Sequence, residues 1–147
     1  QELFTIYKLR TMNSNAEDGT AKWASINDKR VTKIGNFLRK SRLDELPQLI
    51  CVIRGEMSLI GPRPERKVFD DKLKKVIPFY NSRYFIKPGL SGWAQVNYPY
   101  GASIEDSKQK LSYDLYYLRN FSNWLDFLIF FKTIRLVFLR RGALPLK

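Results

Sequence analysis

The sequence of 147 residues contains no histidine, and this absence excludes several kinds of active site. Ser-His-Asp triads, histidine-ligated zinc sites and histidine general bases all need the missing imidazole. The single cysteine, Cys51, excludes an internal disulfide and a metal site made of cysteines alone. Any catalysis must therefore use carboxylates, Lys or Arg side chains, hydroxyl groups, the backbone or a metal ion that prefers oxygen ligands.

Acidic residues are also scarce, since 14 Asp and Glu stand against 26 Lys and Arg, which gives a formal net charge of +12. A surplus of this size predicts a polyanionic partner. Nucleic acid, anionic lipid headgroups and phosphorylated metabolites all fit, and charge alone does not choose among them. No apolar run reaches the roughly 18 residues of a membrane-spanning helix.

Hydrophobic periodicity predicts one mainly helical α+β domain with a few short strands. Five segments are expected to be helical: Arg30–Lys40 with Asp28 as its cap, Leu46–Arg54 starting just before Pro47, Glu65–Ile77, the stretch from Ser103 through Leu118, and Trp124–Arg141. Two segments are expected to be strands: Phe4–Leu9 and Trp93–Val96. The strand pattern at Phe4 has no start signal before it, so we expect a piece of a longer protein.

The segment Trp124–Arg141 is the most apolar in the chain, but Asp126, Lys132 and Arg135 interrupt it. It is therefore too polar to cross a bilayer. Two interpretations remain open: a buried core helix, or an amphipathic helix that lies in a membrane interface.

Two adjacent carboxylates, Asp44 and Glu45, stand at the expected start of a helix, just after Arg42. The helix dipole and the neighbouring cations favour the ionised form, so we expect Asp44 to be a carboxylate at neutral pH. Such a group can cap the helix, hold Mg²⁺, or attack phosphorus or a glycosidic carbon.

Several cations are placed where they could bind a phosphate. Pro62 and Pro64 enclose Arg63 and stiffen its backbone, which suits bidentate phosphate binding but also fits a rigid turn with a solvated side chain. Lys8 and Arg10 are two residues apart and would point to one side of a strand. Together with the carboxylate pair, these cations predict phosphoryl chemistry on a diphosphate with Mg²⁺.

Six motifs occur in register and make the chain resemble the bacterial sugar transferases, the monotopic polyprenyl-phosphate phosphoglycosyl transferases that begin exopolysaccharide and O-antigen synthesis. The resemblance runs from about Phe4 to Ala143 and is closest to the larger exopolysaccharide-associated members. The motifs are Lys8–Met12, Arg30–Gly35, Leu43–Leu49, Gly55–Pro64, Lys87–Asn97 and Tyr113–Tyr117.

The resemblance implies that a UDP-sugar donates its sugar-1-phosphate to undecaprenyl phosphate with release of UMP. By analogy, Asp44 attacks phosphorus, forms an aspartyl-phosphosugar intermediate and shares in holding Mg²⁺, while Glu45 assists transfer. The resemblance also supplies candidate substrate- and phosphate-binding residues: Lys8, Arg10, Arg42, Arg63 and Asp114. From the residues alone, Asp114 fits structural packing better, because it lies among tyrosines at helical spacing.

The family implies a location at the cytoplasmic face of the bacterial inner membrane, against anionic lipid, and self-association is left open. The resemblance implies an N-terminal membrane hairpin, which we expect to lie outside this sequence, and the loop Asn97–Ala102 lacks a phosphate-binding Arg found in smaller members. The alternative is a basic nucleic-acid-binding module without catalysis. We expect no nucleic-acid partner, because the cations gather on the first helix while the aromatic residues lie towards the C-terminus.

Overall fold

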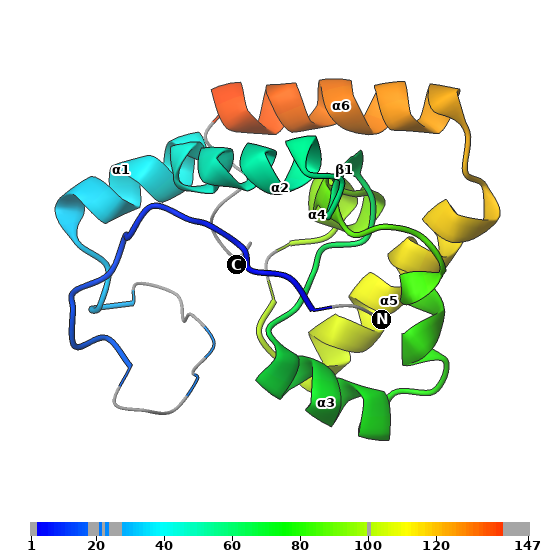
Figure 1. Cartoon of the computed structure of the whole chain (residues 1–147), viewed down its shortest axis with the longest axis horizontal. Helices are drawn as coiled ribbons and strands as arrows, with labels where there is room; N and C mark the ends of the chain where they lie inside the picture. Colours follow the sequence, from blue (N-terminus) through cyan, green and yellow to red (C-terminus); the bar gives the residue numbers. More distant parts are fainter. Residues whose placement is uncertain (1–2, 18–20, 22, 24–27, 100, 140–147) are drawn as a thin grey trace.

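The computed structural model describes residues 3–17, 21, 23, 28–99 and 101–139. Most of the described chain is helical, and one sheet of two short strands lies among the helices (Figure 1). This confirms the expected mainly helical α+β class. The elements follow in the order α1 (Lys33–Ser41), the 3₁₀ helix η1 (Leu43–Gln48), α2 (Leu49–Ile53), β1 (Ser58–Ile60), α3 (Lys67–Val76), the 3₁₀ helix η2 (Tyr80–Phe85), β2 (Gly89–Ser91), α4 (Trp93–Asn97), α5 (Ile104–Arg119) and α6 (Asn123–Phe138).

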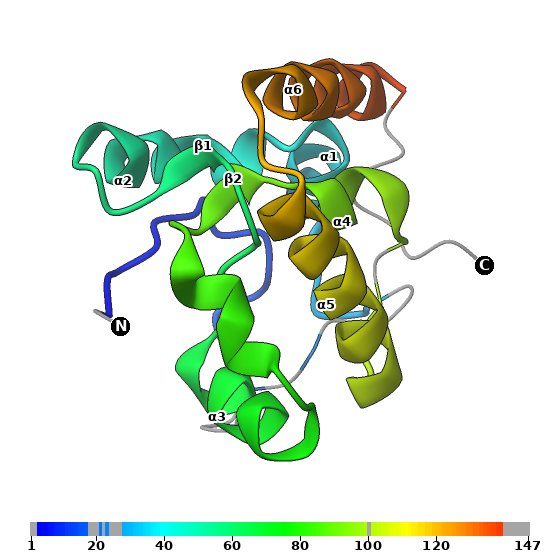
Figure 2. The same cartoon turned by 90° about the vertical axis from the view of Figure 1, so that its right-hand side faces the viewer.

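The strands β1 and β2 pair in parallel, with Ser58 opposite Gly89 and Ile60 opposite Ser91. Glycine is required where they meet, because a Cβ atom on Gly89 would lie 2.1 Å from the backbone nitrogen of Gly61. The close approach fixes the segment that follows β1. In the view of Figure 2, the strands lie between α2 and α4, with α6 above them and α3 and α5 below.

Within the described residues, two apolar clusters form the core. Leu73 and Ile77 at the end of α3 pack with Tyr80 and with Leu111 of α5. Helices α5 and α6 meet through the other cluster, Tyr117, Leu125 and Ile129. Helix α5 therefore joins the two halves of the core and fixes α3 and η2 relative to α6.

Helix α1 begins one turn later than expected, with a different cap. The hydroxyl of Thr32 accepts a hydrogen bond from the backbone N–H of Gly35 at 2.9 Å, whereas Asp28 binds Arg30 before the helix starts. The helix ends at Arg42, which adopts the left-handed conformation with φ 58°. A side chain at this backbone angle costs about 1–2 kcal/mol. The reversal starts η1 at once and places Asp44 in its first turn.

Two of the sequence predictions for strands are wrong. Trp93–Val96 lies in the helix α4, and the strand falls earlier, at Gly89–Ser91. Phe4–Leu9 is extended but pairs with no described strand.

The C-terminal helix ends at Phe138, so the predicted extension to Arg141 falls partly outside the described residues. The helices at Glu65–Ile77 and from Ser103 are confirmed, the latter with the full capping box between Ser103 and Asp106.

Candidate active site

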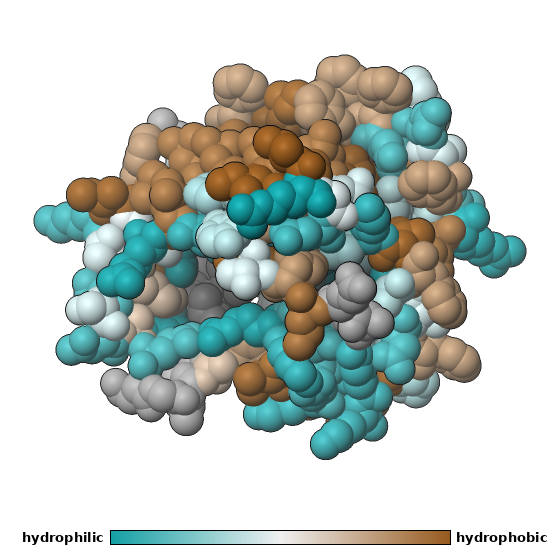
Figure 3. Space-filling model, viewed as in Figure 1, coloured by the Kyte–Doolittle hydropathy of each residue, from teal (hydrophilic) through white to brown (hydrophobic). Residues whose placement is uncertain are grey.

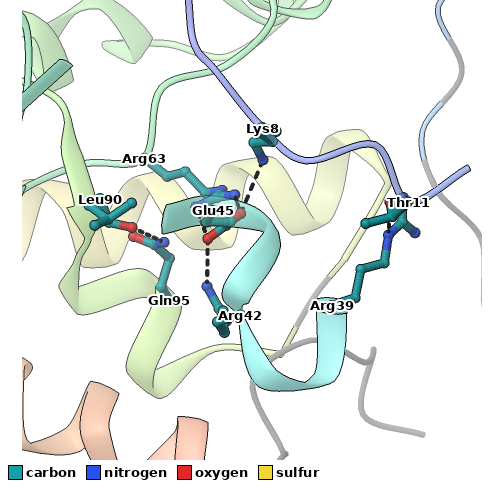
Figure 4. Close-up of polar contacts among 8 residues, drawn as sticks. All are labelled: Lys8, Thr11, Arg39, Arg42, Glu45, Arg63, Leu90 and Gln95. Carbon is teal, nitrogen blue, oxygen red and sulfur yellow. Dashed lines mark hydrogen bonds and ion pairs between the residues drawn. The ribbon is translucent and has the colours of Figure 1, made fainter. Parts of the chain in front are cut away.

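Glu45 lies at the centre of a cationic cluster formed by three separate segments of the chain (Figure 4). Its Oε1 accepts a hydrogen bond from Lys8 Nζ at 3.1 Å, and its Oε2 accepts one from Arg42 Nη1 at 3.3 Å. Arg63 donates to both oxygens, through Nη1 to Oε2 at 3.3 Å and through Nη2 to Oε1. The extended N-terminal segment, the junction of α1 with η1 and the loop after β1 therefore meet at one carboxylate.

The cations fix the protonation state of Glu45, whose side chain is only 12% exposed. Burial alone would raise the pKa of this carboxyl, but the charges of Arg63, Lys8 and Arg42 outweigh burial and hold the pKa well below its usual range. Glu45 is therefore ionised at neutral pH and cannot donate a proton there. When Asp44 is ionised too, the cluster keeps one positive charge in excess, which attracts an anionic ligand.

Asp44 is the neighbour of Glu45 but has different surroundings. Its backbone carbonyl accepts a hydrogen bond from the N–H of Leu9 at 2.9 Å. Among the described residues, no Lys or Arg forms an ion pair with its carboxylate. Burial and the charge of Glu45 raise the pKa of Asp44, and Lys8 and Arg39 only partly offset them.

This shift is opposite to the one expected from a helix start. The helix that begins here is a 3₁₀ helix of six residues, so its dipole is small, and the adjacent negative charge of Glu45 counts for more. The two carboxylates thus have different properties: Glu45 is neutralised by cations, while Asp44 is half-buried and free of ion pairs within the described chain. Environments that separate two carboxyl groups in this way are typical of sites where the groups have different roles.

Two residues of the predicted set do not join the cluster. Arg10 is exposed and makes none of the contacts to Glu45. Asp114 is 2% exposed and forms an ion pair with Arg83 at 2.9 Å. Burial, opposed by Arg83 and Lys110, raises the pKa of Asp114 to about 6. Asp114 therefore faces the interior, as the alternative of structural packing predicted.

Sequence reasoning missed Arg83. It lies in η2, which carries none of the six motifs, and no local pattern distinguishes it from the other 25 basic residues. Its importance is visible only in three dimensions, where it donates a 2.6 Å hydrogen bond to the backbone carbonyl of Arg63.

Few side chains at this site could bind a metal ion. Within the described residues, no group of three or more His, Cys, Asp or Glu side chains gathers in one place. Both oxygens of Glu45 are engaged by cations, which leaves Asp44 as the carboxylate of the pair that could bind an ion. One carboxylate with substrate phosphates is a ligand set that Mg²⁺ uses in proteins, so the residues fit a substrate-borne magnesium ion.

An apolar surface lies on the same side of the molecule as α1, α2 and α6 (Figure 3). We call it the apolar face and define it by the exposed side chains of these helices: Ile34, Phe37, Ile50, Ile53, Trp124, Phe127, Phe131 and Phe138. Leu125 and Ile129 on the opposite side of α6 are buried, so this side of the helix belongs to the core, as the first interpretation expected, while the other side is exposed. No helix in the described part of the chain is long and apolar enough to span a membrane.

Fold and site together define a small α+β domain in which a carboxylate pair lies in an anion-attracting cluster. A family model described as bacterial sugar transferase matches residues 1–140, and the chain belongs to this family. The family expected from the motifs is thus confirmed.

Relatives agree with this assignment over most of the chain. An N-acetylgalactosaminephosphotransferase of Aeromonas hydrophila that uses UDP-N-acetylgalactosamine and undecaprenyl phosphate is 51% identical over 140 residues, which are 95% of this chain and 33% of the relative. The UDP-glucose:undecaprenyl-phosphate glucose-1-phosphate transferase of Escherichia coli K12 is 40% identical over 94% of this chain and 30% of its own length. An undecaprenyl-phosphate galactose phosphotransferase of Salmonella typhimurium is 36% identical, over 97% and 32%. The chain spans about a third of the length of these relatives.

Proposed function

We propose that this domain transfers a sugar-1-phosphate from a UDP-sugar to undecaprenyl phosphate, with Asp44 as the nucleophile. The observation that carries the proposal is the contrast within the carboxylate pair. Glu45 is bound by three cations, whereas Asp44 has no ion pair among the described residues, and a nucleophilic carboxylate needs an oxygen that no cation occupies.

The proposed reaction has two displacements at one phosphorus atom. An oxygen of Asp44 forms a bond to the phosphorus that carries the sugar, and the bond from this phosphorus to the UMP oxygen breaks. UMP leaves with the electron pair. An oxygen of undecaprenyl phosphate then attacks the same phosphorus, and the Asp44 carboxylate leaves. Neither step needs a strong general acid, because both leaving groups are stable anions; the absence of histidine is thus no obstacle.

The cationic side chains bind the anionic substrates in this proposal. Lys8, Arg42 and Arg63 hold Glu45 in the resting protein and present the remaining positive field to the diphosphate. Asp44 would hold Mg²⁺ together with the phosphate oxygens, and the ion would neutralise charge that develops on the diphosphate.

We place the domain at the cytoplasmic face of the bacterial inner membrane, with the apolar face against lipid. Two observations support this location: the exposed apolar side chains of α1, α2 and α6, and the net charge of +12, which favours anionic headgroups. A polyprenyl phosphate is held in the bilayer, so the catalytic site must lie near the membrane surface to receive it.

The test is exchange of labelled UMP into UDP-sugars by the full-length protein in reconstituted membranes, without lipid acceptor. This exchange requires a covalent intermediate, because only reversal of the first displacement can return UMP to the donor. Asp44→Asn should reduce exchange by roughly a thousandfold or more, the scale of losing a nucleophile. Asp71→Asn is the matched control, since Asp71 is an exposed aspartate of α3 that pairs, among the residues the structure describes, with Lys67 alone.

Mass spectrometry of the trapped enzyme should find a phosphosugar on the peptide that contains Asp44. A panel of UDP-sugars in the UMP-exchange assay identifies the sugar, which differs among the relatives. Undiminished exchange by the Asp44→Asn protein would remove Asp44 as the nucleophile.

A further inference from the structure

Arg83 is buried in η2 and binds three groups with one guanidinium. Its Nη2 donates to the backbone carbonyl of Arg63 at 2.6 Å and pairs with Asp114 Oδ2 at 2.9 Å. Its Nη1 donates to the hydroxyl of Tyr80 at 2.7 Å. The side chain is 8% exposed, so its position is fixed by these partners rather than by solvent.

The segment Gly61–Pro64 needs a hydrogen-bond donor from outside the sheet, such as Arg83. On one side β2 holds it, through hydrogen bonds from Gly61 N–H to the Ser91 carbonyl at 2.8 Å and from Gly89 N–H to the Pro62 carbonyl at 2.9 Å. Neither proline of the segment has an N–H to extend this pairing. The carbonyl of Arg63, one residue further on, receives its hydrogen bond from Arg83 instead. The backbone around Arg63 is thus held in two places: β2 binds it at Gly61 and Pro62, and Arg83 binds the carbonyl of Arg63 itself.

We infer that Arg83 is a positioning residue for the proposed phosphosugar transfer: by fixing the backbone of Arg63, it keeps the Arg63 fork directed at Glu45 and at an incoming phosphate. This inference rests on the proposed function. Asp114 in turn fixes Arg83 from α5, so its place in the site is indirect. The connection from Asp114 through Arg83 to Arg63 joins the core to the cationic cluster.

Arginine is specifically required for this task. A planar guanidinium presents several N–H groups in fixed directions, whereas a Lys ammonium is a single point of attachment. Arg83→Lys keeps the positive charge that Asp114 needs, so the core retains its ion pair. It cannot keep the bonds to Tyr80 and to the Arg63 carbonyl at the same time.

The experiment compares four full-length proteins in reconstituted membranes: wild type, Arg83→Lys, Arg63→Ala and the double variant. We expect kcat/KM for UMP exchange to fall at least tenfold in Arg83→Lys. In the Arg63→Ala background the same change should cost less than twofold, because Arg83 acts through Arg63. Arg119→Lys, an exposed arginine at the end of α5, is the control and should exchange like wild type.

A merely structural role gives a different result, since loss of folded protein would multiply with the effect of Arg63→Ala. Such multiplication, or wild-type exchange by Arg83→Lys, would overturn the inference. Should Arg83→Lys fail to fold, Tyr80→Phe removes one partner of Arg83 and keeps the buried ring. We expect it to lower exchange at least threefold with the same dependence on Arg63, and exchange equal to wild type would contradict us.

Binding of UDP, measured by calorimetry on the same proteins, separates the inference from the proposed function. We expect at least fivefold weaker UDP binding in Arg83→Lys and no further weakening once Arg63 is alanine. If the wild type binds UDP with this dependence but catalyses no exchange, the positioning inference stands and the proposed reaction falls. A wild type that neither binds UDP nor exchanges UMP would contradict both.

Discussion

At the scale of the residue, the site depends on two neighbouring carboxylates with opposite surroundings. Glu45 accepts hydrogen bonds from Lys8, Arg42 and Arg63, whereas Asp44 is destabilised as an anion by burial and by Glu45 itself. The three cations therefore have two effects. Through Glu45 they hold their own chain segments together, and their excess charge leaves a positive field beside Asp44. Through these ion pairs, Glu45 joins the three chain segments that carry the cations.

The first prediction concerns the pH dependence of stability conferred by Glu45. Its folded pKa lies well below the ordinary 4.5, so the folded state binds fewer protons than the unfolded state as pH falls through this window. The stabilisation is fully present above pH 4.5 and is lost as pH falls towards the folded pKa. Replacing Glu45 with Gln should lower the free energy of unfolding by about 2 kcal/mol at pH 7, because three cations lose their partner.

Urea unfolding between pH 7 and pH 3 measures this effect. The difference between wild type and Glu45→Gln should shrink as pH falls below 4.5. Glu105→Gln, an exposed glutamate in the first turn of α5, is the control and should differ little from wild type at any pH. A Glu45→Gln difference that stays constant down to pH 3 would show that the ion pairs do not stabilise the fold.

Much of this site could be predicted from sequence, and one part could not. The motifs identified Glu45, Lys8 and Arg63, and the family resemblance added Arg42. Their mutual contacts join residues 37 and 18 positions apart, and local patterns carry no information on such pairings. The raised pKa of Asp44 was not visible in the sequence for the same reason, because burial and the charge of Glu45 in the folded chain oppose the effect expected from the helix start.

At the scale of the element, α1 places the carboxylate pair, and its contact with the N-terminal segment depends on Gly35. A Cβ atom at this position would lie 1.9 Å from the carbonyl oxygen of Thr11. The same carbonyl accepts a hydrogen bond from the backbone N–H of Thr32 at 3.0 Å. The helix therefore packs directly on backbone, with no room for a side chain.

We predict that Gly35→Ala destabilises the protein although alanine favours helices. Propensity alone would stabilise α1 by about 1 kcal/mol. Overpacking against a main-chain carbonyl costs about 1–3 kcal/mol, and here backbone rather than a flexible side chain must move. Because backbone must move, the cost should lie near the upper end of this range, and chemical denaturation should show a net loss of about 2 kcal/mol. Asn36→Ala, an exposed position in the same helix, should be neutral or slightly stabilising, and a stabilised Gly35→Ala protein would refute the packing argument.

Helices whose capping residues lie within a few positions of their start could be predicted from sequence. Elements whose type is determined by contacts with distant residues could not. The capping box of Ser103 and Asp106 lies within four residues and starts α5 as expected. Trp93–Val96 carries aromatic and β-branched residues and so predicted a strand, but tertiary packing overrides that local preference. In the fold, Trp93 stacks on Tyr116 with ring centroids 5.7 Å apart, and Lys132 lies 4.6 Å above its ring.

At the scale of the whole molecule, the apolar face and the net charge of +12 predict binding to anionic lipid by two separable contributions. Charge attracts the protein to headgroups and is screened by salt, whereas apolar side chains enter the acyl boundary and are not. Ile53 at the end of α2 is 86% exposed, so its replacement should disturb binding without disturbing the core.

The final prediction measures both contributions by sedimentation with vesicles. Full insertion of one isoleucine is worth about 1.5–3 kcal/mol, so Ile53→Ser should weaken binding to vesicles containing anionic lipid by roughly tenfold or more. Raising the salt concentration should weaken wild type and variant by the same factor, because the two proteins carry equal charge. Ile104→Ser is the matched control: this exposed isoleucine begins α5, about 22 Å of helix away from the end that leads to α6. Equal binding by wild type and Ile53→Ser, with all binding lost in salt, would mean that charge alone holds the domain to lipid and that the apolar face has another occupant.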